Sequence, residues 1–387
     1  MFKRKAAFGL DIGSCSVKAV QMRRTSRGIE LEKFASVPIY PNGKSDSETD
    51  VRAAKIAAIE RAVAAAKITA KNVVSSVSGE SIIVRYIQLP HMTEEELRNA
   101  LRYEAEEYIP FHIEEVNLDS HILGVTEEGG SRRLNVLLVA AKKDIIGSHL
   151  DLIRGAGLIP EIVDVDSFAL FNCYEQSARP SPDEVVVLVD IGSQITNINI
   201  YHGGLSHFAR DINLGGRTIT TALEQKLGIS FSEAEQLKFS EGVHVAAPAP
   251  SVDTDGGEGE DSPLIESLQG AVNEMTGEDL GDDSLESQAS RIIRGSLNTL
   301  VAEIRRSLQF FENQVSGQPV SRMVLCGGTA RLPNIANHFT QEIGLPTEIF
   351  NPVASLSLNS KNIDENTLAN CREVLGVGIG LALRKVA

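Results

Sequence analysis

A motif that occurs twice constrains this sequence of 387 residues more than any other feature. The first copy, within residues 8–20, is an apolar strand that ends in Asp-Ile-Gly-Ser at 11–14 and continues into a second β-type stretch. The second copy, within residues 186–200, has the same four residues at 190–193. The two aspartates lie 179 positions apart (190 − 11), so the repeat marks two similar halves. Paired strand–turn–strand loops that face each other across a cleft can hold a nucleoside triphosphate from both sides.

The residue types in both turns suit contact with phosphate groups. Gly13 and Gly192 permit backbone angles that other residues avoid, and they let a ligand approach the main chain closely. Successive N–H groups in such a turn form a concave anion-binding site, to which the hydroxyls of Ser14 and Thr196 add donors. Gly-containing turns also join ordinary hairpins. Two copies, each after a buried-type strand, favour the phosphate interpretation.

The charged residues of the motif predict a metal ion beside the phosphates. Asp11 and Asp190 would repel phosphate unaided, so we expect them to bind, through water, a Mg²⁺ ion that keeps much of its hydration shell. Lys18 can reach a phosphate as a point charge. The motif therefore predicts a site for a nucleoside triphosphate and Mg²⁺ between two halves.

Composition is typical of a globular protein from a reducing compartment. A length of 387 residues suffices for two or more domains with real cores. The four cysteines are scattered without metal-ligand spacing, which indicates the cytoplasm. No apolar run approaches the roughly 20 residues of a membrane span. The basic start, residues 1–5, is interpreted as a solvated terminus rather than a signal peptide.

One segment carries most of the net charge of −15. Between Val243 and Gln288 there are twelve acidic residues and no Lys or Arg, so the rest of the chain sums to about −3 (−15 + 12). Net acidity disfavours nucleic acid as a partner, although the remainder is nearly neutral. The Gly, Pro and Ser content of the segment is typical of disorder. We therefore predict a disordered acidic insertion over residues 243–288.

Hydrophobic periodicity predicts strands and helices that alternate around the two motif copies. Helices are expected at 47–67, 94–108, 144–156, 168–176, 218–227, 232–240, 290–315 and before Ile343, with a small-residue helix at 376–383; further strands are expected at 73–78, 82–89, 119–125, 134–141, 159–165 and 323–326. Thr93 and Glu96 form a capping-box pattern, and Pro110 stops the helix that follows. Residues 80–165 are thus expected to form a small α+β unit between the motif copies.

The order of these elements resembles the actin-like ATPase superfamily, which includes actin, the heat-shock chaperone ATPase domain, sugar kinases and the cell-division protein FtsA. The resemblance implies an α/β fold with two lobes around a nucleotide cleft, ATP and Mg²⁺ as ligands, and connecting helices at 166–174 and 376–383. Carried over residue by residue, it assigns Asp11, Gly13, Ser14, Cys15 and Lys18 to the first phosphate loop, Asp190, Gly192, Ser193 and Thr196 to the second, Gly327, Gly328 and Thr329 to an adenosine loop, and Gly215, Gly216, Glu235 and Lys238 to the ribose and base.

The small α+β unit at 80–165 indicates which branch of the superfamily the sequence resembles. It lies where FtsA and its relatives carry a relocated subdomain, 1C, and the stretches 104–111 and 304–311 are similar to the family of the type IV pilus assembly protein PilM. FtsA usually ends in a detached amphipathic membrane helix, whereas only residues 384–387 follow the last predicted helix here. The implied domains are subdomain 1A at 1–80, 1C at 81–165, a connecting helix and 2A at 166–215, 2B at 216–322 with the acidic insertion, the second part of 2A at 323–360, and a 1A helix at 361–387.

The resemblance also implies partners. It predicts an ATP-binding cytoplasmic scaffold, peripheral at the inner membrane through other proteins, that binds the N-terminal cytoplasmic tail of PilN and contacts other inner-membrane and motor components. A groove between the first subdomain and 1C would receive the tail as an extended peptide. The expected lining comprises Ile83, Tyr86, Ile87, Leu89, Tyr108, Ile109 and Phe111, and ordinary core packing is the alternative for each.

Two positions depart from the superfamily's pattern. Cys15 stands where related loops often have Ser or Thr, and we interpret it as a small apolar filler whose backbone N–H supplies the donor. Asp166 stands where the chaperones have a Glu, and it is one methylene shorter. Because such carboxylates position the attacking water, Asp166 is the expected catalytic residue, and we expect at most slow ATP hydrolysis. The nucleotide would mainly set the angle between the halves.

Two other functions stay open from the sequence. One is an FtsA-like filament protein that anchors cell-division machinery to the membrane. The other is a sugar-kinase-type phosphotransferase, which needs a positioned carboxylate base and a sugar pocket, and the sequence has no strong signature for either.

Overall fold

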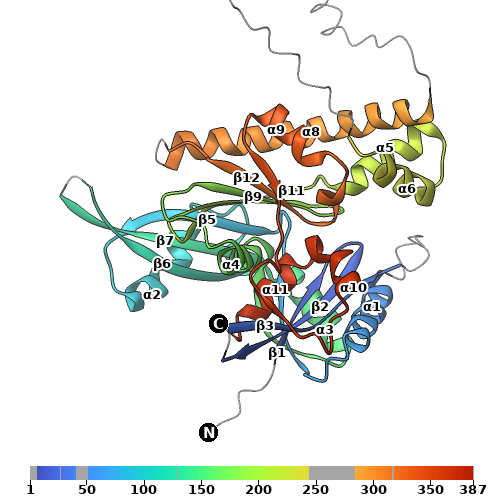
Figure 1. Ribbon diagram of the computed structural model, residues 1–387. Helices are drawn as coiled ribbons and strands as arrows, with labels where there is room; N and C mark the ends of the chain where they lie inside the picture. The colour runs from blue at the N-terminus through green and yellow to red at the C-terminus, as the bar shows by residue number, and fades with distance from the viewer. Residues whose placement is uncertain are drawn as a thin grey trace, which may run out of the picture.

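Two lobes, each built around one copy of the doubled motif, form the body of the protein, and a three-stranded sheet projects from their junction (Figure 1). The structure is a computed structural model that describes residues 7–26, 28–40, 51–128, 130–243, 284–315 and 318–386. The acidic insertion predicted at 243–288 lies outside the described residues except at its two ends.

The first lobe contains a six-stranded sheet in the order β14-β3-β2-β1-β4-β8. Its strands are β1 (Ala7–Ile12), β2 (Ser16–Thr25), β3 (Gly28–Pro38), β4 (Asn72–Val77), β8 (Ile159–Val165) and β14 (Ser357–Leu358). Successive side chains of a strand point to opposite faces, so Phe8 and Leu10 pack with helices α1 (Val51–Ala65) and α3 (Lys143–Gly155). Ala7 packs on the other face, with helices α4 (Asp166–Ala178) and α11 (Gly376–Leu383).

The second lobe contains a five-stranded sheet in the order β11-β10-β9-β12-β13. Its strands are β9 (Val186–Ile191), β10 (Thr196–His202), β11 (Leu205–Ile212), β12 (Arg322–Cys326) and β13 (Thr347–Ile349). Helices α5 (Gly216–Leu227), α6 (Phe231–Glu241), α8 (Leu285–Val315) and α9 (Ile335–Ile343) share a core with one face of this sheet. The long α8 runs along the outer side of the lobe (Figure 1).

Helices α4 and α11 pack between the sheets, and their contact depends on glycine. A Cβ added at Gly380 of α11 would lie 1.7 Å from the carbonyl oxygen of Ala169 in α4. A Cβ added at Gly9 of β1 would lie 2.2 Å from the carbonyl oxygen of Gly378. Main chain therefore packs directly on main chain where the two lobes are joined, as the small-residue composition of 376–383 predicted.

The projecting unit is an antiparallel sheet in the order β5-β7-β6, with β5 (Ile82–Pro90), β6 (Val116–Glu128) and β7 (Ser131–Lys142). Helix α2 (Glu94–Ala105) covers it, and the predicted capping box of Thr93 and Glu96 is present. The predicted extent of this unit, 81–165, was too long. β8 pairs with β4 of the first sheet, and α3 packs in the core of the first lobe, so the independent unit ends with β7.

Short elements complete the described chain: the 3₁₀ turns η2 (Ile113–Glu115), η3 (Gly328–Arg331) and η4 (Arg372–Val374), and helix α10 (Glu365–Ala369). The predicted boundary at 360/361, between the second part of subdomain 2A and the last part of 1A, was placed too late in the chain. β14, at 357–358, already pairs with β3 of the first sheet. Helix α8 begins at Leu285, inside the segment predicted to be an insertion. The helix expected at 47–67 begins at Val51, and residues 47–50 lie outside the described residues.

Candidate functional site

The two copies of the motif fold into the same turn. In the first lobe the N–H of Gly13 donates to the carbonyl of Ser16 at 3.1 Å, and in the second the N–H of Gly192 donates to the carbonyl of Ile195 at 3.0 Å. Each turn follows a buried strand and leads into an antiparallel partner, as the sequence predicted. The repeated sequence therefore corresponds to a repeated structure.

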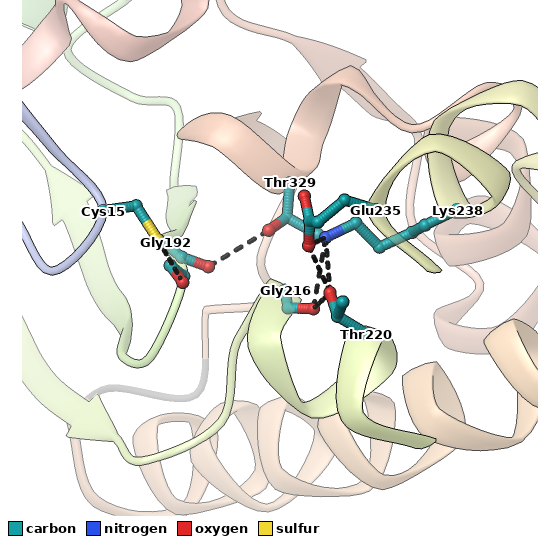
Figure 2. A network of polar contacts seen from close by, with 8 residues as sticks. Cys15, Gly192, Gly216, Thr220, Glu235, Lys238 and Thr329 are labelled. Atoms are coloured by element: carbon teal, nitrogen blue, oxygen red, sulfur yellow. Dashed lines mark hydrogen bonds and ion pairs between the residues drawn. The ribbon is translucent and has the colours of Figure 1, made fainter. Parts of the chain in front are cut away.

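Both turns line one cavity of about 410 Å³ between the lobes. The Cys15 thiol donates to the Ser193 hydroxyl at 2.9 Å, which joins the two turns directly (Figure 2). Of the residues predicted to bind nucleotide, metal or water, those that line the cavity are Asp11, Gly13, Ser14, Cys15, Lys18, Asp166, Asp190, Gly192, Ser193, Gly327 and Gly328. The thiol points across the cavity instead of packing as apolar filler, which corrects that interpretation of Cys15.

Lys18 and Asp11 form an ion pair at the cavity wall. Their charged atoms, Nζ and Oδ2, lie 3.1 Å apart. Burial lowers the pKa of Lys18, but attraction to Asp11, with help from Asp190 and Asp166, outweighs it, so the pKa is raised above its ordinary value. The ammonium thus remains charged at neutral pH and is held by a carboxylate.

The two other aspartates of the cavity, Asp166 and Asp190, hold their protons more tightly than usual. Burial, and then repulsion from Asp11, raises the pKa of Asp166 to about 6, even though the Ser76 hydroxyl donates to it at 2.5 Å. Burial and the charges of Asp11 and Asp166 raise the pKa of Asp190 to about 7. Converging carboxylates with one lysine among them form a site that favours an added cation.

The carboxylates fit a hydrated divalent cation better than a metal centre built from protein ligands. Among the residues that the structure describes, no three His, Cys, Asp or Glu side chains surround one metal position. Mg²⁺ is commonly held by one or two carboxylates, with water and phosphate oxygens completing its octahedron. Asp11 and Asp190 are suitable for that role.

A polar network lies directly behind the second turn (Figure 2). Lys238, only 3% exposed, donates to Thr220 Oγ1 at 2.9 Å and to the carbonyl of Gly216 at 3.3 Å, and it pairs with Glu235. Burial lowers the pKa of Lys238, and Glu235 offsets only part of that effect. These side chains connect α5 to α6 and do not line the cavity.

The start of α5 and Thr329 hold the second turn through its carbonyl groups. The N–H of Gly216 and the hydroxyl of Thr329 both donate to the carbonyl of Gly192, at 2.9 and 3.0 Å. A Cβ at Gly215 would lie 2.6 Å from the carbonyl oxygen of Ser193, so only glycine fits there. Gly215, Gly216 and Thr329 therefore position the turn, and they lie outside the lining of the cavity.

Thr196 does not supply the donor that the sequence predicted. Its side chain is fully buried, and its hydroxyl donates to the carbonyl of Leu214 at 2.7 Å. The residue starts β10 and faces into the lobe, because the turn ends before it. Its role is to anchor the chain that leads into α5.

A comparison with protein families shows to which family this chain belongs. A family model described as type IV pilus assembly protein PilM matches residues 9–244 and 278–386. The chain belongs to this family. It therefore has the α/β actin-like ATPase fold that the sequence predicted. The internal stretch left unmatched, 245–277, falls within the acidic segment.

Solved structures agree with this assignment. The PilM–PilN type IV pilus biogenesis complex contains a chain that is 28% identical, with a TM-score of 0.75 and complete coverage of both chains. The ethanolamine utilization protein EutJ from Carboxydothermus hydrogenoformans is 12% identical over 99% of this chain and 90% of its own, with a TM-score of 0.50. The second similarity concerns the fold alone.

A groove in this PilM family member lies between the projecting unit and the first lobe, where the sequence predicted one. It has a volume of about 870 Å³. Strands β6 and β7 form one wall through residues such as Leu123 and Leu137, and β8 and α4 form the other through Val163 and Phe168. Gly204 and the first two residues of β11, 205–206, also line it.

The predicted lining of that groove was wrong. Ile87, Leu89 and Ile109 are buried in the core of the projecting unit, and Tyr108 and Phe111 pack against that core. Ile83 and Tyr86 line a different cavity, of about 740 Å³, between β5, β11 and α8. The Tyr86 hydroxyl lies 2.5 Å from the Ser206 hydroxyl of the second lobe, and burial raises its pKa to about 12.

Several polar residues of the cavity between the lobes were not found from the sequence. They are Lys55, Ser76, Ser78, His149, Gln194, Asn197 and Glu373. The run of small polar residues at the end of β4 was a usable signal for the two serines, because ligands bind at the carboxyl ends of strands. Lys55 and His149 belong to helices α1 and α3, and neither residue is part of a recognisable sequence motif.

No helix in the described part of the chain is long and apolar enough to span a bilayer.

Proposed function

We propose that this protein is an ATP-binding scaffold of type IV pilus assembly that binds the N-terminal cytoplasmic tail of PilN. The observation that carries the proposal is the combination of a doubled phosphate turn around three aspartates with a separate peptide-sized groove. A solved structure that aligns over the whole of both chains is a complex of PilM with PilN. The protein would be cytoplasmic and would lie at the inner membrane through PilN and other pilus components.

The cavity supports ATP and Mg²⁺ as its ligands. The turns at 13–16 and 192–195 line the cavity from both lobes and would offer main-chain N–H groups to phosphate. Gly327 has no side chain to fill the space beside Asp190. A Mg²⁺ ion held through water by Asp11 and Asp190 would neutralise phosphate charge. Residues of both lobes line this one cavity, so bound ATP would fix the angle between the lobes.

The same geometry supports slow hydrolysis at most. Asp166 is the carboxylate that would orient a water molecule, but its short side chain already accepts a hydrogen bond from the Ser76 hydroxyl. Its pKa of about 6 leaves it partly protonated near neutral pH. Calorimetry should detect Mg²⁺-dependent ATP binding, and a phosphate-release assay should detect far less than one turnover per second. Turnover of many ATP molecules per second by the isolated protein would contradict the scaffold role.

The groove between β6–β7 and β8–α4 supports an extended peptide as its ligand. Its walls carry apolar side chains such as Leu123, Leu137 and Phe168 beside polar ones such as Asn117 and His121. β6 is an edge strand, so its outward N–H and C=O groups can pair with a peptide main chain, while alternate side chains enter pockets. This combination suits a short tail without structure of its own.

A charge placed in the groove should weaken binding of the PilN tail. We expect Leu123→Arg to weaken binding of a fluorescent PilN tail peptide by about tenfold or more, because the substitution puts a cation among apolar groups. Val125→Arg is the matched control: it places the same charge two residues further along β6, at a position that is 44% exposed and outside the groove. Fluorescence anisotropy measures both. Equal losses in the two variants, or none in either, would remove the groove from the proposal.

A further inference from the structure

The cavity between the lobes continues beyond the phosphate turns, to a second end formed by helices. Lys55 of α1 and Ser148 and His149 of α3 line this end, together with Ile145 and Leu152. The two helices pack against each other there, since Arg52 pairs with Asp151 at 3.7 Å. Nothing in the proposed nucleotide site uses these residues.

Two consecutive serines of β4 show how the cavity reaches this end. Ser76 donates to Asp166 at 2.5 Å, and Ser75 lies 2.7 Å from His149 Nε2. Neighbouring residues of a strand point to opposite faces of the sheet. Because Asp166 and His149 nevertheless line one cavity, the cavity passes around the carboxyl end of β4, from the face covered by α4 to the face covered by α1 and α3.

The two ends differ in charge. At the α4 end, Lys18 is held by Asp11, and Asp166 and Asp190 add further carboxylates. At the other end, no Asp or Glu of α1 or α3 lines the cavity. Lys55 has no ion-pair partner among the described residues, and burial alone lowers its pKa. A partly buried cation without a counter-charge is a binding element for an anion.

The protonation of His149 follows from its neighbours. The Ser75 hydroxyl donates its only proton to the carbonyl of Leu10 at 2.9 Å, so His149 Nε2 must be the donor to Ser75. Nδ1 is then left with a lone pair, and no donor within the described part of the chain contacts it. Burial and the nearby Lys55 lower the pKa of His149 to about 4, so the ring is neutral at pH 7. This end therefore offers a cation, a hydroxyl and one acceptor.

We propose that the end of the cavity formed by Lys55, Ser148 and His149 binds inorganic phosphate as a site separate from the nucleotide turns. Hydrogen phosphate has anionic oxygens for Lys55 and Ser148 and a P–OH group that can donate to His149. The terminal phosphate of a nucleotide is fully ionised above neutral pH and lacks that hydroxyl, as does sulfate. The inference rests on the proposed function in one respect, because slow ATP hydrolysis would supply phosphate to the other end of the same cavity.

The test is a calorimetric titration of inorganic phosphate into the full-length protein in the presence of ADP and Mg²⁺. We expect saturable binding that Lys55→Met weakens about tenfold or more, the size expected for loss of a charge-assisted hydrogen bond. Arg52→Met is the matched control, since it removes a cation one turn earlier on α1, from an exposed ion pair. It should leave phosphate binding within about twofold. Sulfate should bind more weakly than phosphate, and His149→Phe should remove that preference.

Two arms separate this inference from the proposed nucleotide site. ADP binding in the presence of Mg²⁺ should be the same in Lys55→Met as in the unmodified protein. If the unmodified protein did not bind ADP at all, the nucleotide site would be contradicted instead. If Lys55→Met weakened ATP binding and left free phosphate unaffected, Lys55 would serve the terminal phosphate of ATP and the separate site would be wrong. No binding of phosphate by the unmodified protein would also overturn it.

Discussion

Asp190→Asn is expected to weaken Mg²⁺-dependent ATP binding by about 10- to 100-fold while making the ligand-free protein more stable. The loss of affinity follows from removing a carboxylate that holds the metal through water, for which such losses are typical. Calorimetric titration with ATP in Mg²⁺ and in EDTA measures it, and only the Mg²⁺-dependent part should fall. Asp183→Asn is the matched control, because Asp183 is exposed and lies outside the cavity. Unchanged ATP affinity in Asp190→Asn would contradict the assignment of the site.

The gain in stability comes from the raised pKa of Asp190. Its folded-state value of about 7 exceeds the ordinary value of 3.8, so between these pH values the folded protein holds a proton that the unfolded chain has released. The free energy of unfolding therefore falls as pH rises from about 4 to 7. The pKa of about 6 for Asp166 acts in the same direction.

Thermal unfolding at pH 5 and pH 8 tests this sign. Without nucleotide, the unmodified protein should be less stable at pH 8, and Asp190→Asn should recover about 1–3 kcal/mol there and little at pH 5. Saturating ATP and Mg²⁺ should reduce the pH dependence of the unmodified protein, because the cation favours the ionised carboxylate. An Asp190→Asn protein that is less stable than the unmodified one at pH 8 would contradict the pKa assignment.

Gly380→Ala is expected to destabilise the protein by about 3 kcal/mol or more. The added methyl group would meet the carbonyl oxygen of Ala169 at 1.7 Å, and backbone cannot turn aside as a side chain can, so α4 and α11 must separate. Both helices join the lobes, and the same variant should therefore lose ATP affinity. Denaturant unfolding measures the first effect, and calorimetry measures the second.

Gly295→Ala is the control for that prediction. Gly295 is an exposed residue of α8, and no atom lies within 4 Å of the position that its Cβ would take. The substitution should therefore stabilise the protein by about 0.5–1 kcal/mol, through the unfolded state. If Gly380→Ala were tolerated as well as Gly295→Ala, close packing of α4 on α11 would not be what joins the lobes.

The sequence was sufficient for those parts of the site that a contiguous motif determines. Asp11 and Asp190 end buried strands, and the turns after them need glycine, so residue type and position together predict both turns and their carboxylates. Lys55 and His149 are 94 positions apart in the chain (149 − 55), and they reach the same cavity from two different helices. Their position in the cavity depends on how α1 packs on α3, and no local sequence pattern predicts that packing.

The error in the groove has a similar physical origin. Ile87 and Leu89 share a face of β5, and the sequence shows that this face is apolar without showing what it meets. In the structure that face packs under α2, whereas the groove is formed by the other two strands and by β8. β8 follows the small unit in sequence but pairs with β4. The pairing of strands that are distant in sequence therefore determines both which residues line the groove and where the projecting unit ends.

Amide hydrogen exchange measured on four samples tests the central claim most directly: that a phosphate clamp and a separate peptide groove occupy one scaffold. The samples are the protein alone, with ATP and Mg²⁺, with the PilN tail peptide, and with both. We expect ATP to protect the turns at 11–18 and 190–196, and the peptide to protect β6 and the start of α4. Peptide protection confined to β5 and α2, or no protection by either ligand, would contradict it.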